Sequence, residues 1–303
     1  MRVLVTGASG LLGFRVARLA ARAHSVVAAY STTPVELAGA ETVRLDVLDR
    51  ESVFRAVKSA DPDTIIHCAA MAGVDDCERF PEKAVAVNGT GTESLAMAAR
   101  NVGAKLAYVS TDYVFDGKKQ GAYTELDAPN PINSYGRSKL RGEFAARLAG
   151  NYAVARTSVL FGWNLCGSRE NFYAKMVGAL KRGEQVQLDT SSIVTPTFVE
   201  NAAEGLVRIG ESGARGLFHV SGGVAMNRFE FGLLAARVFG FDESLITPST
   251  PGEFGWLAKR PENSALSAEK AERELGLKPV PPKEGWMRMK QELEMASPGG
   301  WRL

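Results

Sequence analysis

A tyrosine and a lysine lie four residues apart in the segment Asn133-Ser134-Tyr135-Gly136-Arg137-Ser138-Lys139, where the pattern predicts that a helix begins. Side chains at positions i and i+4 of a helix share one face, with their Cβ atoms about 5–6 Å apart. An ammonium group beside a phenol favours the phenolate and lowers the phenol pKa from about 10 toward the range of a general acid. Tyr135 and Lys139 are therefore a candidate proton-transfer pair, although the same spacing also occurs by chance on surface helices.

The chain opens with an apolar run at residues 2–6, a glycine-rich turn at 7–13, and apolar residues at helical spacing. In this order one glycine permits the tight turn, one lets backbone N–H groups approach a pyrophosphate, and one lets the helix pack on the strand. The helix N-terminus then faces the phosphates. An ordinary strand-to-helix turn is the alternative, but the position of the turn at the start of the chain favours a dinucleotide site. The residues expected there are Gly7, Ser9, Gly10, Leu11, Leu12 and Gly13.

The end of the second expected strand, residues 25–30, bears on the choice of cofactor. Sites specific for NAD usually carry an acid there, which binds the ribose hydroxyls of adenosine. The segment that follows this strand has no acid, and its hydroxyl groups, including that of Ser31, can accept a 2′-phosphate with Arg15 as a candidate counter-charge. The sequence therefore favours NADP, with NAD as the second choice, while a solvated helix residue is an equally good interpretation of Arg15.

Strands and helices continue to alternate along the first half of the chain. A third strand is expected at 43–47, and Asp46 and Val47 at its end are expected near the adenine. There follow a helix from its candidate cap Asp49 to about Ala60, an apolar strand at 64–70, a helix at 81–102 and a strand at 105–110. Such alternation predicts an α/β fold of the Rossmann type, a doubly wound parallel sheet that binds ligands at the carboxyl ends of its strands. That rim would include Cys68, Ala69, Ala70 and Thr111.

The second half is less regular. A strand at 152–156 is followed by a Gly/Asn/Cys loop at 162–170, helices at 171–182, 200–209, 228–239, 267–275 and 283–294, and strands at 185–188 and 216–220. This part indicates a smaller mixed α/β domain that binds the substrate. We expect a dinucleotide-binding domain at 1–160, also using 197–225, and a substrate-binding domain at 161–196 and 226–303.

Composition excludes several other classes of protein. The 303 residues include 36 Lys+Arg and 34 Asp+Glu without a long like-charge run, so nothing indicates a nucleic-acid or membrane partner. Three cysteines and three histidines lack metal-ligand spacing, and no metal is expected. The sequence shows neither a signal-peptide pattern nor a membrane-spanning apolar run, which favours the cytoplasm. The oligomeric state does not follow from the residues, and a homodimer is compatible with them.

The pieces together suggest a carbonyl reductase. If the helix of Tyr135 packs beside the strand that ends at Thr111, both side chains reach one carbonyl oxygen next to the nicotinamide. Tyr135 would then donate a proton to the developing alkoxide, while Thr111 hydrogen-bonds the same oxygen and Lys139 holds the nicotinamide ribose.

The chain resembles the extended short-chain dehydrogenase/reductase superfamily along nearly its whole length. The resemblance rests on Gly7-x-x-Gly10-x-x-Gly13, His67-Cys68-Ala69-Ala70, Ser110-Thr111-Asp112-Tyr113-Val114-Phe115 and Tyr135-x-x-x-Lys139. With Pro131-x-Asn133 and Arg260-Pro261-x-Asn263-Ser264, the chain looks most like the dTDP-4-dehydrorhamnose reductase family. That resemblance implies reduction of the 4-keto group of a nucleotide-linked 6-deoxysugar. The substrate contacts it implies are Thr111, Asp112, Tyr113, Asn171, Thr197 and Arg260.

Some positions depart from the patterns of related families. Tyr113 stands where the dehydratases of the superfamily carry a glutamate, which argues against dehydration. His67 replaces the asparagine that the reductases usually have, and Thr190 and Val194 replace a Gln and a Gly. The His-Cys-Ala-Ala segment is more similar to the regulatory beta subunit of methionine adenosyltransferase, which binds NADP. A non-catalytic subunit with that transferase as its partner is therefore the alternative function.

Overall fold

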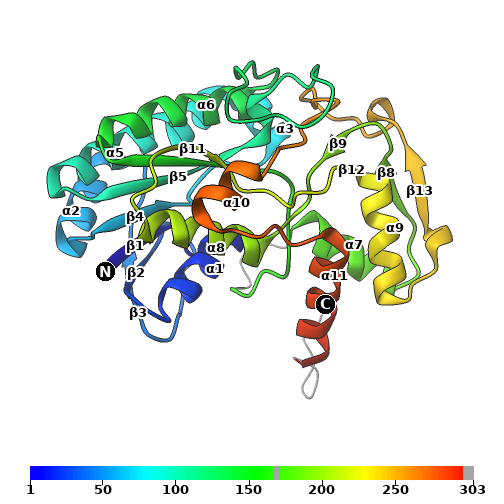
Figure 1. Cartoon of the computed structure of the whole chain (residues 1–303), viewed down its shortest axis with the longest axis horizontal. Coiled ribbons are helices and arrows are strands. Elements are labelled where there is room, and N and C mark those ends of the chain that lie inside the picture. The colour runs from blue at the N-terminus through cyan, green and yellow to red at the C-terminus, as the bar shows by residue number, and fades with distance from the viewer. Residues whose placement is uncertain (167–170, 296–303) are drawn as a thin grey trace.

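A seven-stranded parallel sheet runs through the larger part of the molecule in the order β11-β6-β5-β4-β1-β2-β3 (Figure 1). The computed structural model describes residues 1–166 and 171–295. The strands are β1 (Arg2–Thr6), β2 (Ser25–Tyr30), β3 (Ala40–Arg44), β4 (Thr64–His67), β5 (Lys105–Thr111), β6 (Tyr152–Thr157) and β11 (Gly216–His219). The expected doubly wound parallel sheet is confirmed. The strand order reverses between β1 and β4, and ligands of such sheets bind at this switch point.

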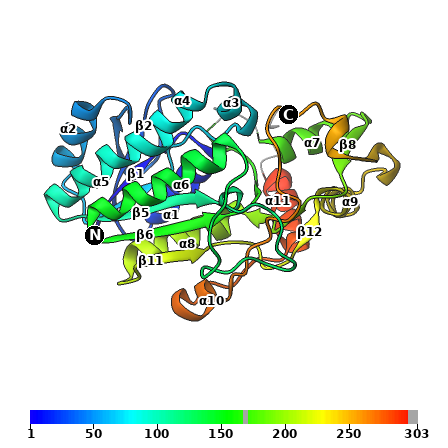
Figure 2. The same cartoon turned by 90° about the horizontal axis from the view of Figure 1, so that it is seen from above.

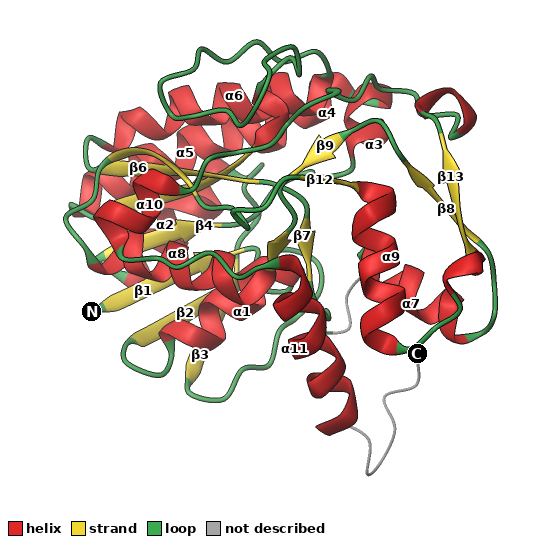
Figure 3. Ribbon diagram, turned by 45° about the vertical axis from the view of Figure 1, so that its right-hand side comes forward, coloured by secondary structure: helices red, strands yellow, loops and turns green. Residues whose placement is uncertain are grey.

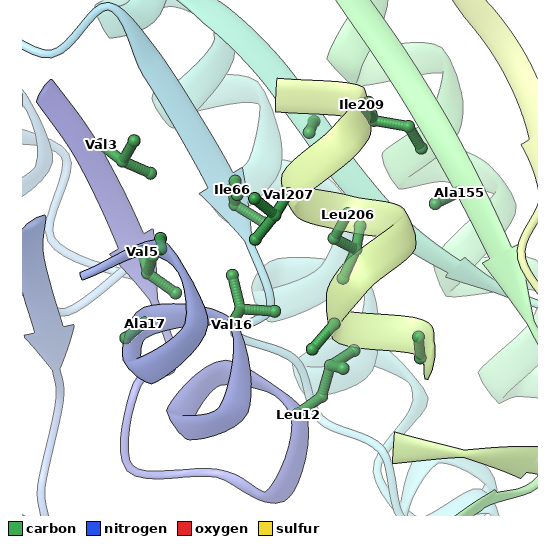
Figure 4. Packing of buried hydrophobic residues seen from close by; sticks show 14 of the residues in the cluster. Val3, Val5, Leu12, Val16, Ala17, Ile66, Ala155, Leu206, Val207 and Ile209 are labelled. Carbon is green, nitrogen blue, oxygen red and sulfur yellow. The ribbon is translucent and has the colours of Figure 1, made fainter. Parts of the chain in front are cut away.

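Helices cover both faces of the sheet, which explains why its central strands are apolar on both sides. On one face α1 (Leu11–Ala20) and α8 (Val199–Glu211) pack on Val3, Val5 and Ile66, as Figure 4 shows. The opposite face, with Leu4 and Ile65, is covered by helices further along the first half of the chain. These are α2 (Arg50–Ala60), α5 (Gly91–Val102) and α6 (Ser134–Ala146), which Figure 2 shows from above.

Several expected elements differ from the structure, among them the strand expected at 64–70, which ends at His67. The third strand is Ala40–Arg44 rather than 43–47, because Leu45 and Val47 are buried under the α2 and α5 layer after the chain has left the sheet. The expected helix 81–102 consists of α4 (Pro81–Val85), a π-helical turn (Ala86–Thr90) and α5, and a further short helix, α3 (Val74–Arg79), precedes it. The π-helical turn contains Asn88, whose Nδ2 donates to the Ser138 hydroxyl of α6 at 2.9 Å.

Apart from β6, α8 and β11, which belong to the sheet and its covering layer, much of the irregular second half forms a smaller unit at the carboxyl end of the sheet (Figure 3). Its main elements are α7 (Phe172–Lys181), β8 (Val186–Asp189), α9 (Arg228–Phe239), β13 (Ile246–Ser249) and α11 (Pro282–Met295). Trp286 of α11 is fully buried, with its ring centroid 5.0 Å from Phe161 and 4.8 Å from Phe231. These aromatic side chains give the unit a hydrophobic core separate from those of the sheet. The last four residues of the loop expected at 162–170 lie outside the described residues.

Short elements complete the part of the chain that the structure describes. They are β7 (Leu160–Phe161), β9 (Ile193–Val194), β10 (Thr197–Phe198), β12 (Met226–Asn227), α10 (Glu269–Leu275) and the 3₁₀ turns Asp112–Val114, Arg147–Ala149, Glu243–Leu245 and Pro251–Glu253. No helix within these residues combines the length and the apolar character needed to cross a membrane.

Candidate active site

A cavity of about 510 Å³ opens at the carboxyl ends of β1, β4 and β5, where the strand order reverses. Its walls come from the glycine turn before α1, the segments after β4 and β5, the start of α6, and residues of the smaller unit. Of the residues expected from the sequence, the cavity brings together Gly7, Gly10, Leu11, Leu12, Gly13, Cys68, Ala70, Thr111, Asp112, Tyr113, Tyr135, Lys139 and Asn171.

The glycine turn has the shape that a dinucleotide needs. Gly7 has φ +68°, and a Cβ there would lie 2.7 Å from Ala69 N, while a Cβ on Gly13 would lie 2.2 Å from Gly7 O. Either side chain would therefore close the turn or push α1 away. Among residues 1–166 and 171–295 no side chain caps the N-terminus of α1 at Gly10, which leaves its first N–H groups to an anion as far as these residues are concerned. These observations fit a bound pyrophosphate.

The start of α6 is fixed from both sides. Asn133 caps the helix by accepting a hydrogen bond from Gly136 N at 2.8 Å, and its Nδ2 donates to Lys259 O at 2.9 Å. A Cβ on Gly136 would lie 2.1 Å from Tyr113 O, so only glycine lets α6 approach the end of β5 this closely. The approach brings the Tyr135 and Thr111 side chains together in the wall of one cavity.

Lys139 presents a buried ammonium group to the cavity. Lys139 is 2% exposed, and its Nζ lies 4.2 Å from the centroid of the Tyr108 ring. No salt bridge joins it to any described residue. Burial lowers the pKa of Lys139 to about 7, against an opposing effect of Glu143. An ammonium without an acidic partner, at the wall of this cavity, fits the role of holding ribose hydroxyls.

The pKa of Tyr135 corrects one expectation from the sequence. Burial raises it above the ordinary value of 10, although the neighbouring Thr111 hydroxyl acts in the opposite direction. The expected lowering of the Tyr135 pKa by Lys139 is wrong for the protein alone, because burial of the phenol is the dominant effect. Tyr135 is consequently a protonated phenol at neutral pH, which is the form that a proton donor requires.

Asp112 organises the segments around Thr111. Its Oδ1 accepts a hydrogen bond from Thr111 Oγ1 at 2.9 Å, and its Oδ2 accepts from Ser158 Oγ at 2.8 Å and Ser264 Oγ at 2.6 Å. Burial raises the pKa of Asp112, and the three hydroxyl donors counteract that effect. Because these donors come from the ends of β5 and β6 and from the C-terminal part, the carboxyl group ties all three segments together.

His67, the residue at the asparagine position, has a structural place beneath the cavity wall. Its Nδ1 lies 2.7 Å from Thr6 Oγ1 and its Nε2 lies 3.1 Å from Thr92 Oγ1. Burial lowers the pKa of His67 to about 3, so the ring is neutral. It therefore joins β1, β4 and α5 and does not line the cavity.

Two expected ligand contacts are wrong. Arg15 is 2% exposed and faces α8 and α11, where it contacts Glu200 and donates to Glu292 Oε1 at 3.0 Å. Its guanidinium thus cannot serve as the counter-charge of a 2′-phosphate. Thr197 is fully buried and its hydroxyl donates to Thr195 O at 3.0 Å, so it does not face the substrate.

Other expected residues do not line the described cavities. Ser31 is exposed, and its carbonyl accepts a hydrogen bond from the exposed Arg44 Nε at 3.3 Å. Arg44 therefore puts a positive charge beside Ser31 that was not expected from the sequence. The Asp46 carboxylate accepts from Leu48 N at 3.0 Å. Those outside the described cavity linings are Ser9, Ser31, Asp46, Val47 and Ala69.

The expected contacts from the smaller unit are already engaged in its own structure. Asn171 caps α7 by accepting from Tyr173 N and Ala174 N, and its Nδ2 donates to Gly162 O at 2.6 Å. Arg260 forms a salt bridge with Asp75 at 2.9 Å, which links the smaller unit to α3. Both nevertheless line cavities, Asn171 the larger one and Arg260 an adjoining cavity of about 230 Å³.

An arginine and several aromatic side chains that no sequence pattern indicated also line these cavities. Arg228, the first residue of α9, lines both of them, and Tyr173 lines the larger. Phe254 and Trp256 line the smaller cavity, with their rings stacked 4.6 Å apart. No motif marks them, because they lie more than 50 residues beyond Thr111 and reach the site only through the fold of the smaller unit.

Comparison with known proteins agrees with this architecture. Residues 1–295 match the family described as RmlD substrate binding domain. The chain is 37% identical to the "Probable low-salt glycan biosynthesis reductase Agl14" of Haloferax volcanii, over 91% of this chain and 93% of that protein. It is 32% identical to methionine adenosyltransferase 2 subunit beta of Danio rerio, over 89% and 84% of the two chains.

A solved structure extends the likeness to three dimensions. The dTDP-4-dehydrorhamnose reductase of Bacillus anthracis, in complex with NADP, superimposes with a TM-score of 0.83 at 31% identity and covers 96% of this chain and 99% of its own. The match to the family spans all but the last residues of the chain. The chain therefore belongs to the dTDP-4-dehydrorhamnose reductase family, the RmlD family, of the extended short-chain dehydrogenases/reductases.

Proposed function

We propose that this NAD(P)-dependent oxidoreductase reduces the 4-keto group of a nucleotide-linked 6-deoxysugar, with NADPH as its preferred reductant. The observation that carries the proposal is the meeting of Thr111, Tyr135 and Lys139 in one cavity beside an open glycine turn. A purely structural cluster would not leave the buried ammonium of Lys139 without an acidic partner among the described residues.

Each side chain of the cavity has a distinct part in the reaction. The bound nicotinamide supplies the hydride. Tyr135, protonated at neutral pH, donates its phenolic proton to the oxygen that becomes the alkoxide, and Thr111 hydrogen-bonds the same oxygen. Lys139 holds the nicotinamide ribose through its ammonium group, and Asp112 fixes the rotamer of Thr111 through the 2.9 Å hydrogen bond.

The substrate class is inferred from relatives. A dTDP-4-dehydrorhamnose reductase with 31% identity shares the fold over 96% of this chain. Tyr113, in place of the glutamate of the dehydratases, leaves the site without the carboxyl group that assists loss of water. Reduction of a keto sugar therefore suits the cavity better than dehydration.

A direct assay tests the proposal. Purified protein supplied with dTDP-4-keto-6-deoxy sugar should oxidise NADPH, and Tyr135→Phe should lower that rate by ~10²–10⁴-fold, the usual contribution of a general acid. NADPH binding should persist in the variant, because the ring and α6 remain. Absence of turnover in the wild type with several nucleotide 4-keto sugars would refute the proposal.

A non-catalytic regulatory subunit remains the second candidate. It is favoured by the 32% identity to methionine adenosyltransferase 2 subunit beta and by His67 at the asparagine position. In that case wild type and Tyr135→Phe would bind NADP equally and both be inert. Co-purification of a methionine adenosyltransferase with the chain would support this candidate over the reductase.

The preference for NADPH rests on Ser31 and Arg44 rather than on Arg15. Arg44 is exposed beside the hydroxyl-rich segment after β2, where an NAD-specific site carries an acid. We expect Arg44→Gln to weaken NADPH binding by ~10-fold, as for the loss of one exposed charge-assisted contact, and to leave NADH binding unchanged. Equal losses for both cofactors would argue against a phosphate contact.

A further inference from the structure

Arg228 lies where the two cavities meet. The larger cavity contains Tyr135 and Lys139, the smaller one contains Phe254 and Trp256, and both are lined by Arg228. Three other residues are common to the two linings: Val74, Tyr113 and Phe172. Asn227 caps α9 immediately before Arg228, which fixes the backbone from which the guanidinium projects.

The partners of this guanidinium are unusual for a partly buried arginine. Nη1 donates to the Tyr173 hydroxyl at 3.1 Å and Nη2 donates to the Tyr113 hydroxyl at 3.4 Å. No described carboxylate forms a salt bridge with Arg228. By contrast, the other arginine of the smaller cavity, Arg260, is paired with Asp75. The Asp112 carboxyl also attracts this guanidinium electrostatically from beyond salt-bridge distance. The two groups that hydrogen-bond it are neutral phenols, so the charge can still attract an anion.

The two phenols add donors of their own. Each hydroxyl oxygen accepts a hydrogen bond from Arg228, so its proton remains available to a further acceptor. Burial raises the pKa of both Tyr113 and Tyr173, which keeps them protonated. Three donor groups therefore converge at the junction of the cavities, a pattern that matches a ligand with several anionic oxygens.

We infer that Arg228, Tyr113 and Tyr173 bind the diphosphate of the nucleotide-linked substrate. The inference rests on the proposed function for the kind of substrate, but the site itself is defined by these three side chains. Arg228 can engage two phosphate oxygens at once through its planar fork, while the phenols donate to the remaining oxygens.

The position of the site agrees with the length of such a substrate. The Tyr113 ring lies between the reacting group and the arginine, with its centroid 6.0 Å from that of Tyr135 and its hydroxyl 3.4 Å from Arg228. A sugar ring with its keto carbon at Tyr135 would extend past Tyr113 and place its anomeric phosphate at Arg228. The base would then enter the smaller cavity, whose walls include the aromatic rings of Phe254 and Trp256.

The cofactor has a different place for its own phosphates. Its pyrophosphate is expected at the glycine turn, whose residues Gly7, Gly10 and Gly13 line the larger cavity but not the smaller one. Arg228 is therefore expected to bind the diphosphate of the substrate and not that of the dinucleotide. The affinities for the two ligands must be measured separately.

Calorimetric titration of dTDP into the full-length protein saturated with NADP tests the inference. Arg228→Gln should weaken dTDP binding by ~10–100-fold, the range for hydrogen bonds to a charged group. Tyr173→Phe, which retains the ring, should weaken it by ~3–10-fold. The matched control is Arg237→Gln, which removes one exposed positive charge from the same helix and should leave dTDP binding within twofold of wild type.

Two further measurements exclude other causes. Thymidine, which has no phosphate, should bind wild type and Arg228→Gln equally, whereas a general distortion of the smaller cavity would weaken it as well. NADP affinity should be unchanged in the variant, because a parallel loss of NADP binding would assign the arginine to the cofactor and overturn the inference. Arg228→Lys, which retains the charge but not the fork, should fall between wild type and Arg228→Gln.

The result is independent of turnover. If the protein binds dTDP through Arg228 but reduces no keto sugar, the diphosphate site stands and the proposed reductase function falls. If the protein reduces a keto sugar and Arg228→Gln binds dTDP as tightly as wild type, the reductase function stands and the diphosphate site is refuted.

Discussion

The ammonium of Lys139 lies 4.2 Å from the centroid of the Tyr108 ring, at the wall of the cavity that contains Tyr135. The ring face offers a cation–π contact, but no described carboxylate pairs with the charge. Burial therefore dominates and lowers the pKa of Lys139 from 10.5 to about 7. The protein tolerates a partly neutralised lysine at a position where a bound cofactor would supply the missing hydrogen-bond acceptors.

The free-energy cost of burying the charged Lys139 side chain predicts how the stability of the protein depends on pH. Between pH 7 and 10.5 the unfolded chain carries a proton on Lys139 that the folded chain has lost, so the stability of the wild type without cofactor should rise with pH in that window. Lys139→Met should therefore raise the melting temperature at pH 7, with a gain that shrinks toward pH 10.5. Turnover should fall by ~10²-fold at every pH. Thermal scans at several pH values check this, with the exposed Lys58→Met as a control.

The ion cluster of Arg15 yields a second prediction. Its guanidinium is almost fully buried, contacts Glu200 and donates to both carboxylate oxygens of Glu292. The variant Arg15→Met therefore leaves two partly buried carboxylates without their positively charged partner. We expect a loss of ~2–4 kcal/mol in the free energy of unfolding. Arg18, one turn further along α1, lies 3.5 Å from Glu200 and is 40% exposed, so Arg18→Met should cost less than ~1 kcal/mol.

Denaturant titration measures the free energy of unfolding of Arg15→Met and Arg18→Met. The ratio of NADP to NAD affinity should be unchanged in Arg15→Met, since its side chain points toward α8 and α11. A selective loss of NADP affinity would mean that Arg15 does contact the 2′-phosphate.

Residues that are neighbours on one element were predictable from the sequence. The glycine turn, the apolar strands and the Tyr135–Lys139 pair depend on local spacing. The strands form the parallel sheet, and the glycine turn and the pair line one cavity at its rim. Asn133 is the N-cap of α6, which explains why the helix starts there. Local spacing, however, does not say which neighbour a side chain will meet.

Long-range neighbours account for what was missed. Arg15 is correctly placed on a helix, but the acids that hold it come from residues 200 and 292, far along the chain. Arg228 reaches Tyr113 across 115 positions, with no motif to connect them. The pKa of Tyr135 was predicted with the wrong sign, because spacing reveals the neighbouring charge but not the burial that outweighs it.

Asp112 should be important for stability as well as for the site. Asp112→Ala leaves the hydroxyls of Thr111, Ser158 and Ser264 without their common acceptor, which we expect to cost ~2–4 kcal/mol. Ser264→Ala removes only one donor and should cost ~1 kcal/mol. Urea titration compares the two, and equal losses would show that the carboxyl group does not act as the shared acceptor.

Gly136 offers the sharpest test of how the site is built. It lies inside α6, where alanine is favoured over glycine by ~1 kcal/mol from helix propensity alone. A Cβ at this position would nevertheless lie 2.1 Å from Tyr113 O, so Gly136→Ala should push α6 away from the end of β5 and destabilise the protein by ~1–3 kcal/mol. The displacement separates Tyr135 from Thr111, and turnover should fall by ~10²-fold because a shift of about 1 Å is sufficient for such a loss. The control is Gly213→Ala, where a Cβ would meet nothing within 4 Å and should leave stability and turnover unchanged. If Gly136→Ala is instead more stable than wild type and equally active, helix propensity has prevailed and the close contact between α6 and β5 is not what positions Tyr135.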